Sequence, residues 1–234
     1  MKIKGTVALV TGANRGIGLA FTRELLARGA RKVYAGARDP STVEQPGVEA
    51  IRLDVTKPDQ VAAAVARAGD VALLINNAGI AHQGGFLALD SEEVARRQLE
   101  TNFFGVLRMS KVFAPTLAAN GGGAILNVLS IASWVNSGRL AAYAASKTAA
   151  RSLTNSLRYE LAPQKTQVLA LHMGFVDTDL ASAIDAPKSS PAEIVKRALD
   201  ALESGFDEVL ADQPAMLTKK GLTAPRPSYL PQGA

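Results

Sequence analysis

Apolar runs alternate with longer amphipathic segments along most of the chain. Short runs rich in Val, Ile, Leu and Ala predict buried strands, whereas apolar residues spaced three or four apart predict helices. The predicted strands cover residues 6–11, 32–35, 48–53, 71–75, 124–128, 168–172 and 208–210. The predicted helices cover residues 16–28, 58–67, 91–119, 143–161 and 191–203. Because strands and helices alternate, we expect an α/β fold in three layers, with a doubly wound parallel sheet and right-handed crossovers.

Polar caps, glycines and prolines mark the ends of these segments. Ser91 stands before two glutamates, as a helix N-cap does, and the glycine run 121–123 follows the end of the same helix. Pro163 stops one predicted helix, and Pro191 begins another. Residues 220–234 hold several prolines and predict an irregular tail.

Composition narrows the classes of protein to consider. A chain of 234 residues that is 47% hydrophobic suits one α/β domain over residues 1–234. It contains no cysteine, which excludes disulfides, thiolate metal sites and cysteine nucleophiles. His82 and His172 lack a spaced acidic partner, so we expect no metal site and a structural role for both. Redox chemistry would therefore depend on an organic cofactor.

Charge and hydropathy address location and partners. No apolar run reaches the roughly eighteen residues that a membrane span needs, and no apolar signal segment precedes the first strand. We expect a cytoplasmic protein with no membrane partner. The net charge is +5, but the basic residues are scattered and aromatic residues make up only 5%. This pattern disfavours nucleic-acid binding and favours attraction of a phosphate-bearing cofactor.

A glycine-rich turn follows the first predicted strand and opens into a helix. Its sequence, TGANRGIG, places Gly12, Gly16 and Gly18 where a tight turn and a close approach of backbone to phosphate are possible. The helix N-terminus adds free N–H groups and a positive dipole. An ordinary glycine-rich turn is the alternative, because the spacing differs from GxGxxG.

The end of the second strand bears on the choice of cofactor. An acidic residue about 20 positions after the glycines would bind the ribose 2′-hydroxyl of NAD. Here Ala37 takes that position and Arg38 follows it, so a guanidinium faces a 2′-phosphate, and Arg15 can approach the same group. We therefore expect NADP(H) in preference to NAD(H). Two alternatives remain open: both arginines are ordinary surface residues, or a shift of one residue presents the carboxylate of Asp39.

Tyr143 and Lys147 stand four residues apart at the start of a predicted helix. Both side chains should project from one helix face, and an ammonium near a phenol lowers the pKa of the tyrosine. That would make Tyr143 a general acid or base. Such a pair is common by chance, but Ser130 ends a predicted strand nearby and Asn102 lies in the long helix.

Together these motifs closely resemble the short-chain dehydrogenase/reductase family between residue 6 and about residue 210. The glycine turn is similar to the family's TGxxxGxG, residues 76–79 to its NNAG motif, and Asn102, Ser130, Tyr143 and Lys147 to its catalytic tetrad. The resemblance implies a Rossmann-like fold. It also implies that Tyr143 donates a proton to the substrate oxygen and that Ser130 polarises the carbonyl.

The resemblance implies two jobs for Lys147, which would bind the nicotinamide ribose and lower the pKa of Tyr143. Asn102 would hold a relay water through its backbone carbonyl at a helix irregularity. The usual Pro-Gly after strand six appears as Met173-Gly174, which removes a fixed φ angle. The cofactor-binding residues implied by the match are Gly12, Asn14, Arg15, Gly16, Ile17, Gly18, Arg38, Asp54, Val55, Asn76, Ala78, Gly79, Tyr143, Lys147, Val176 and Thr178.

The family's substrate cleft corresponds to the region of Trp134, Leu140 and Phe175, whose character suggests an apolar substrate, with core packing as the alternative for each. The resemblance also suggests a homodimer or homotetramer formed through small-residue helix faces. We therefore expect an NADPH-dependent carbonyl reductase or alcohol dehydrogenase acting on a ketone, aldehyde or secondary alcohol. The alternatives are a non-catalytic NADP(H) sensor and a dehalogenase-like relative that has lost the nucleotide.

Overall fold

The computed structural model describes residues 1–231 and contains a seven-stranded sheet in the order β3-β2-β1-β4-β5-β6-β7. Every neighbouring pair of strands is parallel. The strands are β1 (Val7–Thr11), β2 (Lys32–Ala37), β3 (Glu49–Arg52), β4 (Leu73–Asn76), β5 (Ala124–Val128), β6 (Gln167–His172) and β7 (Glu208–Leu210). The chain starts mid-sheet, moves outward through β2 and β3, and returns to β4. The predicted doubly wound α/β fold is thus confirmed, and its switch point lies between β1 and β4.

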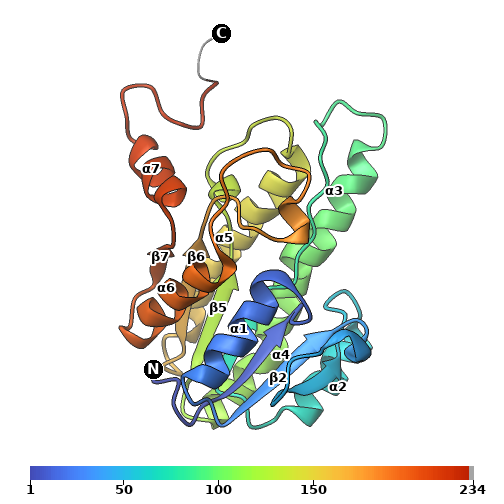
Figure 1. Cartoon of the computed structure of the whole chain (residues 1–234), viewed down its shortest axis with the longest axis vertical. Helices are drawn as coiled ribbons and strands as arrows, with labels where there is room; N and C mark the ends of the chain where they lie inside the picture. Colours follow the sequence, from blue (N-terminus) through green and yellow to red (C-terminus); the bar gives the residue numbers. More distant parts are fainter. Residues whose placement is uncertain (232–234) are drawn as a thin grey trace.

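Helices cover both faces of the sheet (Figure 1). The helices are α1 (Gly16–Ala27), α2 (Pro58–Arg67), α3 (Ser91–Leu99), α4 (Gly105–Ala119), α5 (Ala141–Leu161), α6 (Pro191–Glu203) and α7 (Gln213–Gly221). On one face, Phe21 of α1 and Leu199 of α6 join a buried cluster with the sheet. On the other face, Val61 of α2, Phe113 of α4 and Leu157 of α5 join a second cluster. The sheet is therefore buried on both sides, which explains its continuous apolar strands.

The predicted helix 91–119 is not continuous. A π-helical turn, η2 (Glu100–Phe104), separates α3 from α4, and Gly105 N–H donates to the carbonyl of Glu100 five residues earlier. Asn102 lies within this turn and is 1% exposed. The family resemblance implied an irregularity at this residue, and the structure contains one. A π turn of this kind is frequent at functional sites.

The sequence pattern did not predict α7. Asp212 accepts a hydrogen bond from Ala215 N–H at 2.9 Å as the helix cap, and Pro214 lies in the first turn. Asp followed by proline at this spacing is a helix-start signal, but the segment has little apolar periodicity. After Gly221, the described chain to residue 231 has no helix or strand, and residues 232–234 of the expected tail lie outside the described residues. No helix within residues 1–231 is long and apolar enough to span a membrane.

Candidate active site

The glycine turn lies between the end of β1 and the start of α1. Gly12 and Gly16 have φ angles of +65° and +53°, which favour glycine. A Cβ on Gly18 would lie 2.0 Å from the carbonyl oxygen of Gly12, so α1 can approach the turn only because this position lacks a side chain. A Cβ on Gly16 would lie 3.1 Å from Thr178 Cγ2. The turn therefore lies in close contact with the segment that follows β6.

Asn77, which the sequence analysis did not single out, holds this turn. Its side chain donates to the carbonyls of Thr11 at 2.9 Å and Gly12 at 3.0 Å, and its N–H donates to Thr11 Oγ1 at 3.0 Å. Asn76 differs, because neighbouring residues of a strand point to opposite faces. Its side chain donates to Asn127 Oδ1 at 2.8 Å in the interior. The Asn76 side chain therefore points into the interior, whereas the side chain of Asn77 contacts the turn.

The acidic and basic groups at the end of β2 have distinct surroundings. Arg38 is exposed and makes no hydrogen bond or ion pair with any of residues 1–231. Asp39 Oδ1 accepts hydrogen bonds from Ser41 N–H at 3.1 Å and Ser41 Oγ at 2.8 Å, and these bonds lower the pKa of Asp39. The Asp39 carboxylate is thus committed to the next turn. Arg15 pairs with Asp179 at 2.9 Å instead of lying free beside Arg38.

Other predicted nucleotide contacts surround the same edge of the sheet. Asn14 donates to Thr42 Oγ1 at 3.1 Å, and Asp54 Oδ1 accepts from Thr56 N–H at 2.9 Å. Ala78 N–H donates to Thr11 Oγ1 at 3.0 Å, which places the NNAG segment beside the turn. Ile17 packs on the core, Val55 is buried against Gly105, and Val176 is buried.

The four predicted catalytic residues come from two helical elements and the end of a strand. Asn102 lies in η2, Ser130 follows β5, and Tyr143 and Lys147 lie in the first turns of α5. The Ser130 side chain lies close enough to Tyr143 to lower the pKa of its phenol. Lys147 Nζ donates to the carbonyl of Val128 at 2.8 Å and lies 5.8 Å from the centre of the Tyr143 ring.

Asn102 links the segment after β4 to α5. Its Nδ2 donates to Ile80 O and to Ser146 Oγ, each at 2.9 Å, while its Oδ1 accepts from Ile80 N–H at 2.9 Å. A Cβ on Gly79 would lie 3.2 Å from Asn102 Oδ1 and 3.7 Å from Lys147 Nζ. The absence of a side chain at Gly79 therefore leaves room between Asn102 and Lys147.

Burial dominates the electrostatics of the pair on α5. It raises the pKa of Tyr143 to about 12, against a lowering by the nearby Ser130 hydroxyl, and it lowers the pKa of Lys147 to about 8. The expected lowering of the Tyr143 pKa by Lys147 is not found. The reason is that desolvation penalises both charged forms, while Nζ is directed to a backbone carbonyl.

The three predicted substrate residues have different surroundings. The Trp134 ring stacks on His172, with ring centres 3.9 Å apart. It lines a groove of about 510 Å³ with Ala144, Ala145, Thr148 and Tyr229 among others, and none of the tetrad lines that groove. The Trp134 ring thus packs against His172 beside the turn that follows Ser130. Phe175 is half-buried, and its carbonyl accepts from Ser189 N–H at 2.8 Å.

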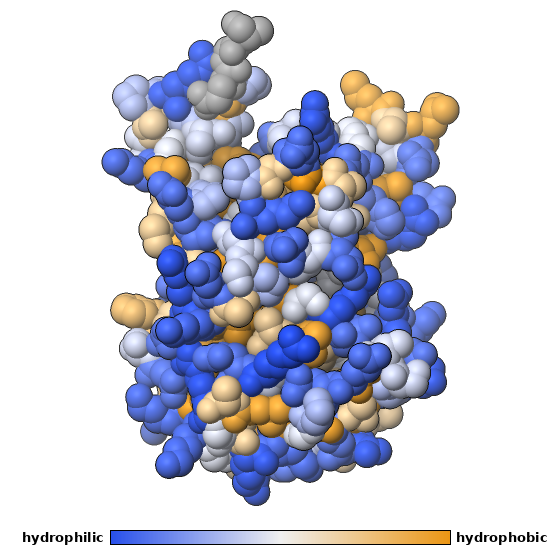
Figure 2. All heavy atoms as spheres, in the orientation of Figure 1, coloured by the Kyte–Doolittle hydropathy of each residue, from blue (hydrophilic) through white to orange (hydrophobic). Residues whose placement is uncertain are grey.

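Leu140 precedes α5 and pairs through a β-bridge with Gly84. Just beyond Gly84 lies an apolar segment that the sequence analysis missed, with Leu87 and Leu89 fully exposed and Phe86 half-exposed. Figure 2 shows apolar side chains gathered at the upper right, over the segment that leads into α3. Exposed apolar side chains therefore lie in the segment that is bridged to Leu140 through Gly84.

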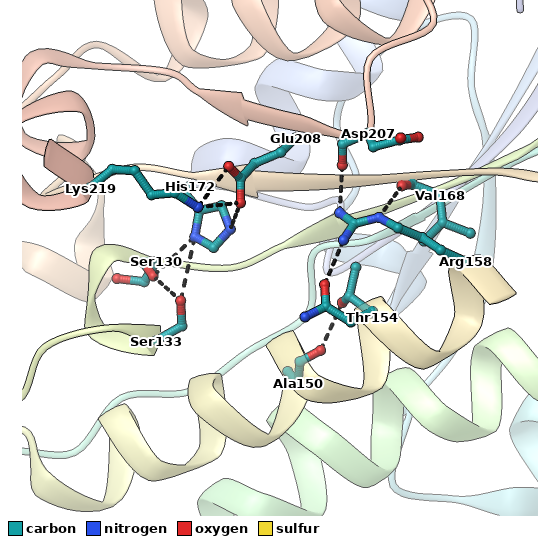
Figure 3. Close-up of polar contacts among 11 residues, drawn as sticks. Ser130, Ser133, Ala150, Thr154, Arg158, Val168, His172, Asp207, Glu208 and Lys219 are labelled. Atoms are coloured by element: carbon teal, nitrogen blue, oxygen red, sulfur yellow. Dashed lines mark hydrogen bonds and ion pairs between the residues drawn. The ribbon is translucent and has the colours of Figure 1, made fainter. Parts of the chain in front are cut away.

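His172 is buried at the end of β6, behind Ser130 (Figure 3). Its Nδ1 lies 3.4 Å from the carbonyl oxygen of Ser130 and from Ser133 Oγ, and its Nε2 lies 3.5 Å from Glu208 Oε1. Glu208 pairs with Lys219 of α7 at 3.0 Å. Burial lowers the pKa of His172 to about 4. A neutral, buried and stacked imidazole fits the structural role expected for this residue.

A glycine turn at the switch point of a doubly wound sheet is the architecture of a dinucleotide-binding protein. The short chain dehydrogenase family profile matches residues 6–189. D-erythrulose reductase of Gallus gallus is 34% identical over 235 residues, 95% of each chain. The chain belongs to the short-chain dehydrogenase/reductase family, and so to the oxidoreductases that act on CH–OH and carbonyl groups.

Solved structures agree with this assignment. A short-chain dehydrogenase from Burkholderia cenocepacia in complex with NADP has a TM-score of 0.93 and 43% identity, covering 97% of this chain and 96% of that one. A 3-ketoacyl-(acyl-carrier-protein) reductase from Brucella melitensis complexed with NADH has a TM-score of 0.81 and 28% identity, covering 91% of this chain and 99% of that one. Relatives of this fold thus bind either nicotinamide cofactor.

Proposed function

We propose that the chain is an NADPH-dependent carbonyl reductase or alcohol dehydrogenase with Tyr143 as its acid/base. The proximity of Ser130 and Tyr143 carries the proposal, because it brings two hydroxyl groups together at the carboxyl edge of a parallel sheet. A substrate oxygen accepting from both would be polarised and protonated at one point. Bound nicotinamide supplies the hydride.

NADP(H) is the proposed cofactor. Ala37 offers no carboxylate to a ribose hydroxyl, Asp39 is bound to Ser41, and Arg38 is free for a 2′-phosphate. Glycine at positions 12 and 18 allows the turn to pack tightly, because side chains there would meet Ala78 and the Gly12 carbonyl, and the N-terminus of α1 that follows can bind a pyrophosphate. We assign the nicotinamide side to Val176, Thr178 and Lys147, and the adenosine side to Asp54, Val55 and Ala78.

The raised pKa of Tyr143 fits carbonyl reduction. With a pKa of about 12, the phenol is protonated at neutral pH and can donate its proton as negative charge develops on the substrate oxygen. Ser130 donates a second hydrogen bond to that oxygen. Lys147 holds the ribose, and Asn102 fixes the backbone around Ile80 beside Lys147. The substrate is a small carbonyl compound, and the apolar surface near Leu140 supports an apolar one.

We also propose a homodimer or homotetramer. The outer face of α5 carries Ala145 and Ala149 beside the groove that holds Trp134. Small residues on a helix face allow a second helix to approach closely.

The decisive experiment follows NADPH absorbance with a panel of ketones, aldehydes and an oxoacyl thioester. Tyr143→Phe should lower kcat by about a hundredfold to ten-thousandfold, because general acid catalysis is lost, while the Kd for NADPH stays within about twofold. Tyr159→Phe on the same helix is the matched control, since Tyr159 is 84% exposed. Unchanged turnover in Tyr143→Phe would exclude the proposed acid. Tight NADPH binding by the wild type without turnover on any substrate would favour the sensor alternative.

A further inference from the structure

The chain between β6 and α6 leaves the sheet at Gly174 and returns at Ser189. The neck of this excursion is closed by backbone hydrogen bonds: Ser189 N–H donates to Phe175 O at 2.8 Å, and Asp177 N–H donates to Ser189 O at 3.0 Å. Val176 and Ser189 form a β-bridge at the same place. Val176, assigned above to the nicotinamide side, lies in the neck, and Thr178, assigned to the same side, lies just past it. Whatever fixes the neck therefore fixes these two residues.

One buried carboxylate reaches both sides of the neck from outside it. Asp212 is 6% exposed, and its Oδ2 accepts from Gly174 N–H at 2.9 Å and from Ser189 Oγ at 3.1 Å. Its Oδ1 accepts from Ala215 N–H at 2.9 Å and so caps α7. Hydrogen bonds to an ionised carboxylate are stronger than neutral ones. Asp212 thus connects the start of the excursion, its end and α7.

The surrounding packing shows why the neck needs such an anchor. Met173 stands where the family has proline, so no ring fixes φ at the exit from β6. A Cβ on Gly174 would lie 2.9 Å from Pro214 Cβ, so α7 lies directly against this glycine. On the far side of the neck, Thr178 contacts the position of Gly16 in the glycine turn. A displaced neck would therefore move Thr178 relative to the phosphate-binding turn.

We propose that Asp212 is a positioning residue for the nicotinamide half of the cofactor, which it holds through Gly174 and Ser189. The inference rests on the proposed function. It assigns α7, through its cap, a role in the cofactor site.

The experiment compares two probes, NADPH and 2′-phospho-ADP-ribose, which lacks nicotinamide. Asp212→Ser keeps a helix-capping hydroxyl for Ala215 N–H but is too short to reach Gly174. We expect the Kd for NADPH to rise about tenfold, because the neck loses both hydrogen bonds to Oδ2 and part of that loss reaches the cofactor. The Kd for 2′-phospho-ADP-ribose should stay within about twofold. Ser189→Ala removes one hydrogen bond to Oδ2 and should give the same selectivity with a smaller rise, about threefold.

Leu217→Gly is the matched control, because Leu217 is 61% exposed on α7 and the change weakens the helix without removing any hydrogen bond of Asp212. It should leave both Kd values unchanged. An equal loss of both probes in Asp212→Ser, or the selective loss in Leu217→Gly, would overturn the inference. A Kd for NADPH in Asp212→Ser equal to that of the wild type would also overturn it. If Asp212→Ser does not fold, Ser189→Ala decides the matter alone. If the wild type shows no turnover, the proposed enzyme is contradicted, while a selective loss of NADPH binding in Asp212→Ser would still support the role of Asp212.

Discussion

Arg15 and Arg38, the two arginines at the predicted nucleotide site, differ in whether they have an ion-pair partner. Arg15 is engaged with Asp179, and the side chains of this pair are 63% and 74% exposed. An ion pair so exposed contributes about 0–1 kcal/mol, so a phosphate can displace Asp179 without much cost. Arg38 has no partner to lose among the described residues. The discrimination between the two nicotinamide cofactors should therefore depend chiefly on Arg38.

Arg38→Ala should raise the Kd for NADPH by about ten- to a hundredfold, because it removes charged hydrogen bonds to the 2′-phosphate. The Kd for NADH, which has no such phosphate, should change by less than about twofold. Both constants can be measured by fluorescence titration. Arg31→Ala, an exposed arginine paired with Asp70, controls for the loss of one positive charge. Equal weakening of NADPH and NADH would refute a 2′-phosphate contact.

At the scale of elements, η2 joins two helices and carries a buried amide between segments far apart in the sequence. Asn102 satisfies both the N–H and the carbonyl of Ile80 and also reaches Ser146 of α5. A buried backbone group left without a partner costs about 1–3 kcal/mol. The π turn is thus the point at which α3, α5 and the segment after β4 are held together.

Asn102→Ala should lower the free energy of unfolding by about 3 kcal/mol, because Ile80 loses the partner of its N–H and of its carbonyl. Chemical denaturation measures the change. Asn120→Ala is the comparison, since Asn120 also donates to two backbone carbonyls, those of Gly69 and Val71, but is exposed. We expect that variant to lose less than about 1 kcal/mol. A similar loss in both variants would show that burial of the amide is not what matters.

The elements also show how far the sequence could predict the fold and the site. Strands buried on both faces are long apolar runs, so the sheet and its alternation with helices followed directly from the pattern. The order of Ser130, Tyr143 and Lys147 was readable for the same reason, since each belongs to the start or end of a predictable element. The pKa values were not, because burial around Tyr143 is a property of the folded chain. Asp212 was missed because its partners Gly174 and Ser189 lie 38 and 23 residues away.

At the scale of the whole molecule, His172 lies where β5, β6, β7 and α7 meet. Glu208 and Lys219 face its ring, Arg151 acts on it at longer range, and Trp134 stacks on it. Glu208 raises the pKa of His172, while Lys219 and Arg151 lower it, and burial outweighs all of them. The folded protein therefore keeps this imidazole neutral at a pH where an unfolded chain would protonate it.

The stability of the protein should fall between neutral pH and about pH 5 for this reason. The pKa of His172 is about 4 when folded and 6.5 when free, so below the latter value the unfolded chain binds a proton that the folded one does not. From about pH 7 to about pH 5 this difference amounts to about 2 kcal/mol. Chemical denaturation of the wild type and of His172→Asn across this range gives the free energy of unfolding at each pH. The comparison isolates the contribution of His172, because Asn cannot titrate and keeps a polar atom near the Ser130 carbonyl. The free energy of unfolding of the variant should depend less steeply on pH, whatever its absolute stability.

Asp39 and Glu49, whose pKa values are lowered, lose their stabilising charge mainly at lower pH. Parallel slopes in the two proteins would mean that His172 is not buried in its neutral form.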